Sequence, residues 1–151
     1  MTKVVLDTNV LINAFKDEYS YEKRIIDEVS NSRLEAYANK QTLQENKLML
    51  QQLLDSPDYD RELNNFFGQI NTVANRRKIS IVDDPEDNKI LESAVEARAD
   101  YLISSDNALL KLEKYDEVAI VNPTQFWTYY KDDQKDNLWT QWTKFITTGK
   151  P

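Results

Sequence analysis

The sequence predicts an α/β protein in which helices cover both faces of a central, mostly parallel β-sheet. Short apolar runs rich in β-branched residues alternate along the chain with longer segments of helical periodicity, which is typical of successive strand and helix units. The 151 residues include only two glycines and four prolines, which is too few for the many turns of a β-sandwich or barrel. We therefore expect a three-layer α/β/α sandwich.

The N-terminal half is expected to contain two strands, each followed by helices. Residues 4–6 are a short β-branched run that suits a strand buried on both faces. A second strand is predicted at residues 34–38. Helical periodicity is visible after each strand, at residues 10–15, 25–29, 43–54 and 59–77.

The C-terminal half continues the alternation. In order, it predicts a strand at 79–82, a helix from Asp84-Pro85, a strand at 101–103, a short helix at 109–112, a strand at 118–121 and a helix from Asn122-Pro123. The second of these elements has the clearest start, because aspartate is a favoured N-cap and proline suits the first helical position.

Residues 131–151 follow the predicted domain of residues 1–130 as a C-terminal amphipathic extension. The extension begins with a charged run and then carries Trp139, Trp142 and Phe145 at helical spacing. Tryptophan stripes are most often packing surfaces, so docking of this helix on the domain is the favoured interpretation. A homodimer contact and a docking surface for another chain are the alternatives.

The composition excludes several classes of enzyme and partner. The chain has no cysteine and no histidine, which removes disulfides, thiolate and imidazole metal ligands, and the usual cysteine and serine hydrolases. A net charge of −7 disfavours a protein that coats nucleic acid irrespective of sequence. No apolar segment approaches membrane-spanning length, and the N-terminus lacks a signal-peptide pattern. We expect a cytoplasmic protein without a membrane partner, in which carboxylates carry any hydrolytic chemistry.

Acidic residues directly follow three of the predicted strands. Asp7 follows the first strand, Asp84 and Asp87 follow the third, and Asp106 follows the fourth. The carboxyl ends of parallel strands lie at one edge of the sheet, where α/β proteins bind ligands. Converging carboxylates need a counter-charge, and Mg²⁺ or Mn²⁺ suits them best. Each acid also has a structural explanation as a helix cap or dipole partner, and that explanation is weakest for Asp7.

Three motifs in this order resemble the PIN domain family. They are Asp7-Thr8-Asn9-Val10-Leu11-Ile12, the stretch from Asp84-Pro85-Glu86-Asp87 to Ala94, and the stretch from Ala99-Asp100-Tyr101 to Ser104-Ser105-Asp106. The resemblance extends from about Lys3 to Phe126 and is strongest to the VapC-like toxins of bacterial toxin–antitoxin pairs. It implies a small α/β/α nuclease that cuts RNA with Mg²⁺ or Mn²⁺.

The resemblance carries four acids of the family onto this chain. The first matches Asp7, the third matches Asp87 and the fourth matches Asp106. The second acid is usually a glutamate in the helix after the second strand, and Glu45 is the best candidate. This last alignment is looser, because a glutamate on an ordinary polar helix face would look the same.

The resemblance also implies two supporting residues. Ser104 matches a hydroxyl residue that helps to orient the metal ligands, and Asn9 matches a polar residue that supports the first acid. With carboxylates and a cation, the expected chemistry is phosphodiester hydrolysis by an activated water. The three aspartates would hold the ions, and Glu45 would either bind a second ion or accept a proton from the water.

The leading hypothesis is a metal-dependent endoribonuclease, the toxin of a toxin–antitoxin pair, blocked by an antitoxin that inserts a basic side chain. One alternative is a PIN-fold nucleic-acid-binding or regulatory module with little nuclease activity. Another is a doubly wound phosphatase or receiver-like domain, which the order of the acids fits poorly. Lys40, Lys47 and Lys89 are the candidates for contacts with RNA phosphates, whereas the basic cluster at residues 76–78 is expected at the opposite edge of the sheet, as positive charge at a helix C-terminus.

Overall fold

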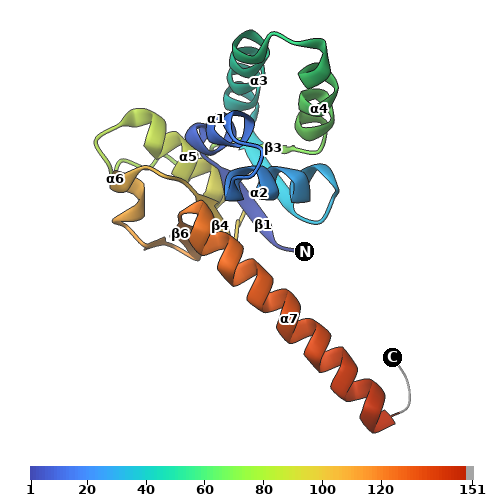
Figure 1. Ribbon diagram of the computed structural model, residues 1–151. Coiled ribbons are helices and arrows are strands. Elements are labelled where there is room, and N and C mark those ends of the chain that lie inside the picture. Colours follow the sequence, from blue (N-terminus) through green and yellow to red (C-terminus); the bar gives the residue numbers. More distant parts are fainter. Residues whose placement is uncertain (149–151) are drawn as a thin grey trace.

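The computed structural model describes residues 1–148, which build a six-stranded β-sheet flanked by helices (Figure 1). The strand order is β3-β2-β1-β4-β6-β5, and all neighbours are parallel except β5 and β6. The strands are β1 (Lys3–Leu6), β2 (Glu35–Asn39), β3 (Asn71–Val73), β4 (Tyr101–Ile103), β5 (Lys114–Tyr115) and β6 (Val118–Val121). The predicted α/β class with a mostly parallel sheet is confirmed.

Helices cover both faces of the sheet and complete the three layers. One face carries α1 (Thr8–Lys16), α2 (Tyr21–Ser30), α3 (Lys40–Leu54), α4 (Pro57–Gly68) and the first turns of α7 (Pro123–Thr148). The other face carries α5 (Pro85–Glu96) and α6 (Asn107–Leu110). Successive residues of a strand point to opposite faces, so Val4 and Leu6 of β1 pack in the first core and Val5 packs in the second. This explains why β1 is apolar without alternation.

Two predictions between residues 59 and 82 are wrong. The helix expected to run to residue 77 ends at Gly68, and the short edge strand β3 follows it. Residues 79–82 do not form a strand. The side chains of α5 satisfy this segment instead, because Ile79 N–H donates to the carboxylate of Glu92 and Val82 N–H donates to Asn88 Oδ1, each at 3.1 Å. A short apolar run whose N–H groups bond to helix side chains can thus look like a strand in the sequence.

Helix α7 begins on the domain and then extends away from it as a long rod (Figure 1). Phe126 and Tyr130 near its start are buried, whereas Trp139 and Trp142 are 67% and 55% exposed. The tryptophans of the extension therefore do not pack on the domain in the described structure, and the interface alternatives stay predictions. Residues 149–151 of the predicted extension lie outside the described residues. None of the helices in residues 1–148 is both long and apolar enough to span a membrane.

Candidate active site

The order of the strands places the topological switch point of the sheet between β1 and β4. From β1 the chain places β2 and β3 on one side and β4 and β6 on the other, so β1 and β4 flank the point where the winding reverses. Ligands of open α/β sheets bind at this point, beyond the carboxyl ends of the strands. Asp7 directly follows β1, and its N–H donates to the carbonyl oxygen of Ile103 at the end of β4 (3.0 Å). The topology thus brings Asp7 beside the loop that carries Asp106.

Asp7 is buried and is surrounded by neutral hydrogen-bond donors. Its carboxylate accepts from Thr8 N–H (2.8 Å), from Ser104 Oγ (2.7 Å) and from Asn9 Nδ2 (3.3 Å). Burial raises the pKa of Asp7, the bonds from Ser104 and Thr8 lower it in part, and the charges of Asp106 and Asp84 raise it further. The environment therefore orients this carboxylate but gives it no compensating positive charge.

Ser104 and Asn9 connect Asp7 to the loop after β4. Ser104 is fully buried, and its Oγ donates to Asp7 while accepting from the N–H of Asp106 (3.0 Å). Asn9 likewise donates to Asp7, and its Oδ1 accepts from Ser105 N–H (3.3 Å). Ser104 thus links Asp7 to the backbone of Asp106, and Asn9 links Asp7 to the backbone of Ser105, which fits the supporting role expected for both.

Asp106 and Asp84 both cap helices. Asp106 Oδ1 accepts from Ala108 N–H (2.7 Å) at the start of α6, and Asp84 Oδ1 accepts from Glu86 N–H (2.9 Å) at the start of α5. The capping roles expected from the sequence are thus observed. Each cap engages one oxygen of the carboxylate, so capping is compatible with a second role for the other oxygen.

Asp87 has the most perturbed acidity of the group. It lies in the first turn of α5 and is buried, at 7% exposure. Burial and then the charges of Asp106, Asp7 and Asp84 raise the pKa of Asp87 from 3.8 to about 6, with a further contribution from a hydrogen bond to the Asp106 carboxyl. Four carboxylates from three different elements thus repel one another at one edge of the sheet.

The donor set fits a hard divalent cation. Carboxylate oxygens on buried and mutually repelling side chains are the ligands that Mg²⁺ and Mn²⁺ prefer. Among residues 1–148, no group of three or more acidic side chains is already spaced to hold a metal ion, and repulsion between the carboxylates opposes their closer approach. The assignment of Asp7, Asp87 and Asp106 as ligands therefore stays a prediction.

Comparison with known families identifies the domain. The family model described as PIN domain matches residues 3–108, a segment that ends just after Asp106. The chain belongs to the PIN domain family. PIN domains are generally nucleases and generally use divalent metal ions. No curated protein and no solved structure gives a significant match to the chain.

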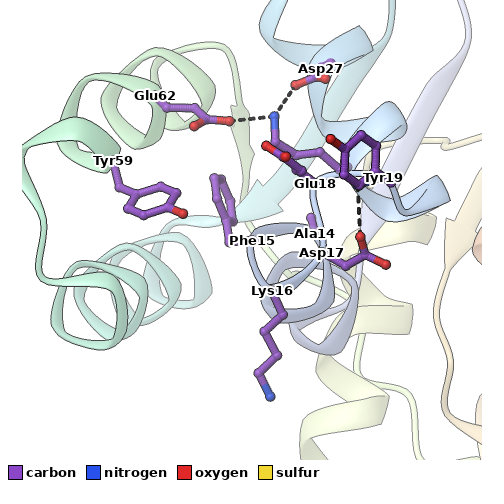
Figure 2. Close-up of a pocket in the computed structure, with 10 residues that line it drawn as sticks. Ala14, Phe15, Lys16, Asp17, Glu18, Tyr19, Asp27, Tyr59 and Glu62 are labelled. Carbon is purple, nitrogen blue, oxygen red and sulfur yellow. Dashed lines mark hydrogen bonds and ion pairs between the residues drawn. The ribbon is translucent and has the colours of Figure 1, made fainter.

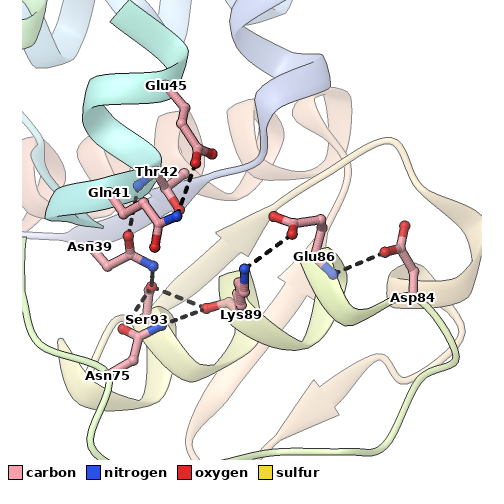
Figure 3. Close-up of polar contacts among 9 residues, drawn as sticks. All are labelled: Asn39, Gln41, Thr42, Glu45, Asn75, Asp84, Glu86, Lys89 and Ser93. Atoms are coloured by element: carbon pink, nitrogen blue, oxygen red, sulfur yellow. Dashed lines mark hydrogen bonds and ion pairs between the residues drawn. The ribbon is translucent and has the colours of Figure 1, made fainter.

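Glu45, whose alignment with the acids of the PIN family is less certain than that of the three aspartates, is exposed on α3. Its carboxylate accepts from Gln41 Nε2 on the same helix (3.1 Å), as Figure 3 shows. The next residue, Asn46, is buried and accepts from Thr8 Oγ1 (3.0 Å). Helix α3 is thus attached to the residue that follows Asp7, but the hydrogen bond of Glu45 leads to Gln41 and not to the aspartates. Its place in the site also stays a prediction.

Sequence reasoning missed a polar network that joins α3 to α5 (Figure 3). Asn39, the N-cap of α3, donates to Ser93 Oγ (3.5 Å), which donates to Asn75 Oδ1 (3.0 Å). Asn75 Nδ2 then donates to the carbonyl of Lys89 (3.1 Å). The sequence signal for this network was the asparagine between a predicted strand and a predicted helix, because asparagine is a favoured N-cap residue. The network holds the helix of Glu45 beside the helix of Asp87.

Two of the basic residues singled out in the sequence form ion pairs with acids. Lys89 pairs with Glu86 (3.1 Å) near the start of α5 (Figure 3). Arg77 pairs with Asp116 (2.6 Å) in the turn before β6, at the edge opposite the aspartates. The position of the 76–78 cluster is as expected, but its explanation as charge at a helix C-terminus is wrong because α4 ends at Gly68.

A separate hollow of about 680 Å³ lies where the end of α1 meets α2 and α4 (Figure 2). Lys23 on its wall forms ion pairs with Asp27 (2.6 Å) and Glu62 (2.5 Å). None of the four candidate acids lines this hollow. Its ion pairs join α2 to α4, and we assign it no part in the chemistry of the aspartate site.

Proposed function

We propose that this PIN domain is an endoribonuclease that hydrolyses RNA phosphodiester bonds with Mg²⁺ or Mn²⁺. The observation that carries the proposal is that the charges of Asp7 and Asp106, which follow the neighbouring strands β1 and β4, act on the buried carboxylate of Asp87. The raised pKa values of Asp7 and Asp87, and the neutral hydrogen-bond partners of Asp7, indicate a cluster of negative charge that a divalent cation would compensate. Phosphodiester hydrolysis is the reaction for which such sites are suited.

The residues divide into ligands and supporting groups. Asp7, Asp87 and Asp106 would hold the ion, and Ser104 and Asn9 orient Asp7 through their hydrogen bonds. When bound, Mg²⁺ or Mn²⁺ lowers the pKa of a coordinated water and polarises the phosphoryl oxygen. Glu45 would approach the site from α3, either as a further ligand or as the group that accepts the proton of the attacking water.

The proposal includes the biological role and partners of the protein. We take it to be the toxin of a toxin–antitoxin pair that acts on cytoplasmic RNA. An antitoxin would block the acidic site by inserting a basic side chain, because the carboxylate cluster has no positive charge among its hydrogen-bond partners. Lys40, Lys47 and Lys89 are the candidates for holding RNA phosphates near the site.

A cleavage assay on a mixture of RNAs tests the activity. The full chain is incubated with Mn²⁺, with Mg²⁺ or with EDTA, and the Asp106→Asn variant is assayed in parallel. We expect internal cleavage with either metal and none with EDTA or with Asp106→Asn. Asp83→Asn is the matched control, because Asp83 is exposed and its substitution makes the same change of net charge.

Two results would contradict the proposal. Cleavage that persists undiminished in EDTA would show that the nuclease does not depend on a metal. RNA binding without metal-dependent cleavage would instead support the alternative of a nucleic-acid-binding or regulatory module. The toxin role has its own test, since expression of the wild type and not of Asp106→Asn should arrest cell growth.

A further inference from the structure

The second half of α7 carries a stripe of large apolar side chains that are exposed in the described structure. The stripe consists of Leu138, Trp139, Trp142, Phe145 and Ile146, which are 66%, 67%, 55%, 48% and 60% exposed, respectively. The two tryptophan rings contact each other at a centroid distance of 5.4 Å. Contiguous exposed apolar surface of this kind usually marks an interaction site.

The stripe is not a continuation of the side of α7 that packs on the domain. That side contains Phe126, which is fully buried, and Tyr130, whose hydroxyl donates to Glu28 Oε2 (2.6 Å). At 3.6 residues per turn, the side of Phe126 lies nearly opposite the side of Trp142. The next residues on the domain-facing side are Asp133 and Asn137, which are polar and exposed. The apolar side of α7 therefore faces the domain in the first half of the helix and faces away from it in the second half.

A helix that extends alone into water needs a partner. Most of the stability of helices in proteins comes from packing of an apolar face, and isolated helices of about 12–15 residues are marginal even with favourable sequences. Residues 131–148 include several threonines, which are weak helix formers. Packing of the stripe against another surface would supply the stability that this segment lacks by itself.

The area of the stripe matches what a dimer of two identical stripes requires. A fully buried aromatic side chain covers about 150–250 Å², so the half-exposed side chains of the stripe together offer roughly 600 Å² per copy. Pairing of two copies would then bury about 1,200 Å², the lower limit for a stable and specific interface. A two-fold dimer is self-complementary, so it needs no other surface.

The charges around the stripe favour an antiparallel arrangement. Asp133 lies opposite Trp142 on the helix and Asp136 lies about 120° from it, so neither acid lies at the centre of the pairing surface. Lys135 lies two turns before Trp142 on the side of the stripe. In a parallel pair the two Lys135 side chains would meet. In an antiparallel pair centred on Trp142, the two Lys135 side chains lie at opposite ends of the pair and do not meet.

From this stripe, its area and its flanking charges we infer that the protein forms a homodimer through an antiparallel pair of α7 helices. The interface lies on the C-terminal extension, and the aspartate site of each copy stays outside it. The inference does not depend on nuclease activity.

The oligomeric state of the full chain tests the inference. Light scattering after size exclusion should give twice the chain mass of 17.7 kDa. Trp142→Asp should raise the dimer Kd at least about thirtyfold, as expected for a central aromatic anchor. Thr140→Asp is the matched control, because Thr140 is exposed and lies nearly opposite Trp142 on the helix. A monomeric wild type at about 100 μM, or a dimer unaffected by Trp142→Asp, would overturn the inference; this concentration lies well above the Kd of typical stable dimers.

Cysteine cross-linking tests the orientation, and the chain has no native cysteine to interfere. The single variants Leu138→Cys and Ile146→Cys place thiols at equal distances on either side of Trp142. An antiparallel pair predicts that an oxidised mixture of the two variants forms a cross-linked heterodimer, whereas each variant alone does not. Cross-linking of each variant with itself would show a parallel pair and would contradict the proposed arrangement.

Discussion

Replacement of Asp87 by asparagine should make the metal-free protein more stable at neutral pH. The pKa of Asp87 is raised from 3.8 to about 6, first by burial and then by Asp106, Asp7 and Asp84. A carboxyl whose pKa is raised on folding favours the folded state while it is protonated. The wild type therefore loses this contribution as the pH rises from about 4 to 6, and above about 6 it carries the full cost of an ionised Asp87.

The size of the effect follows from two opposing contributions. A shift of about two pKa units corresponds to at most about 3 kcal/mol, and solvent screening at the open edge of the sheet reduces this to roughly 1–2 kcal/mol. Asparagine also removes a negative charge from the first turn of α5, which costs about 0.3–1 kcal/mol. The net gain is about 1 kcal/mol, or a rise in Tm of about 3 °C for a chain of this size.

Thermal unfolding of both proteins in EDTA at pH 7.5 and at pH 4 provides the assay. We expect the Asp87→Asn variant to melt about 3 °C higher than the wild type at pH 7.5, and the gain to vanish at pH 4 because Asp87 is then protonated in the wild type. The exposed Asp83→Asn control should show no such difference. Addition of Mn²⁺ should raise the Tm of the wild type more than that of the variant. Destabilisation at pH 7.5, or a gain that persists unchanged at pH 4, would refute the reasoning.

Three further predictions concern the remaining site residues. Asp7→Asn should abolish metal-dependent cleavage of RNA while the protein keeps its far-UV circular dichroism spectrum, and wild-type rates in this variant would remove Asp7 from the site. Ser104→Ala should weaken Mn²⁺ binding, measured by calorimetry, by about 10–100-fold, because Ser104 orients a ligand without touching the ion; unchanged affinity would limit Ser104 to a structural role. Glu45→Gln should lower the cleavage rate by about 10²–10⁴-fold if the carboxylate transfers a proton, whereas recovery at high Mn²⁺ would indicate ligation; an unaffected rate would leave Glu45 as an ordinary surface residue.

The sequence predicted elements well where one local signal dominated. The strand at residues 4–6 is apolar throughout because both of its faces are buried, and Asp84-Pro85 starts α5 as its capping chemistry requires. The strand predicted at 79–82 does not form, because Ile79 is buried against α5 and N–H groups of the segment bond to side chains of that helix. Local sequence cannot distinguish these partners from those in a neighbouring strand.

The aspartates were predicted one by one, but their mutual influence required the fold. Each acid follows a strand or begins a helix, and that position can be read from the chain itself. That Asp7 and Asp106 lie beside each other depends on the pairing of β1 with β4, which are far apart in sequence. The contact of Ser104 with both residues follows from the same pairing.

The sequence by itself determined the fold class, the start of α5 and the set of acids available for chemistry, because hydrophobic periodicity, capping preferences and the absence of histidine and cysteine are local or compositional properties. Only the tertiary structure decided which acids share an environment and which way the aromatic residues of α7 face. Burial and charge repulsion at Asp87, like the exposure of Trp139 and Trp142, arise from residues brought together or kept apart by long-range packing. Such effects depend on distance in space, and distance along the chain does not specify them.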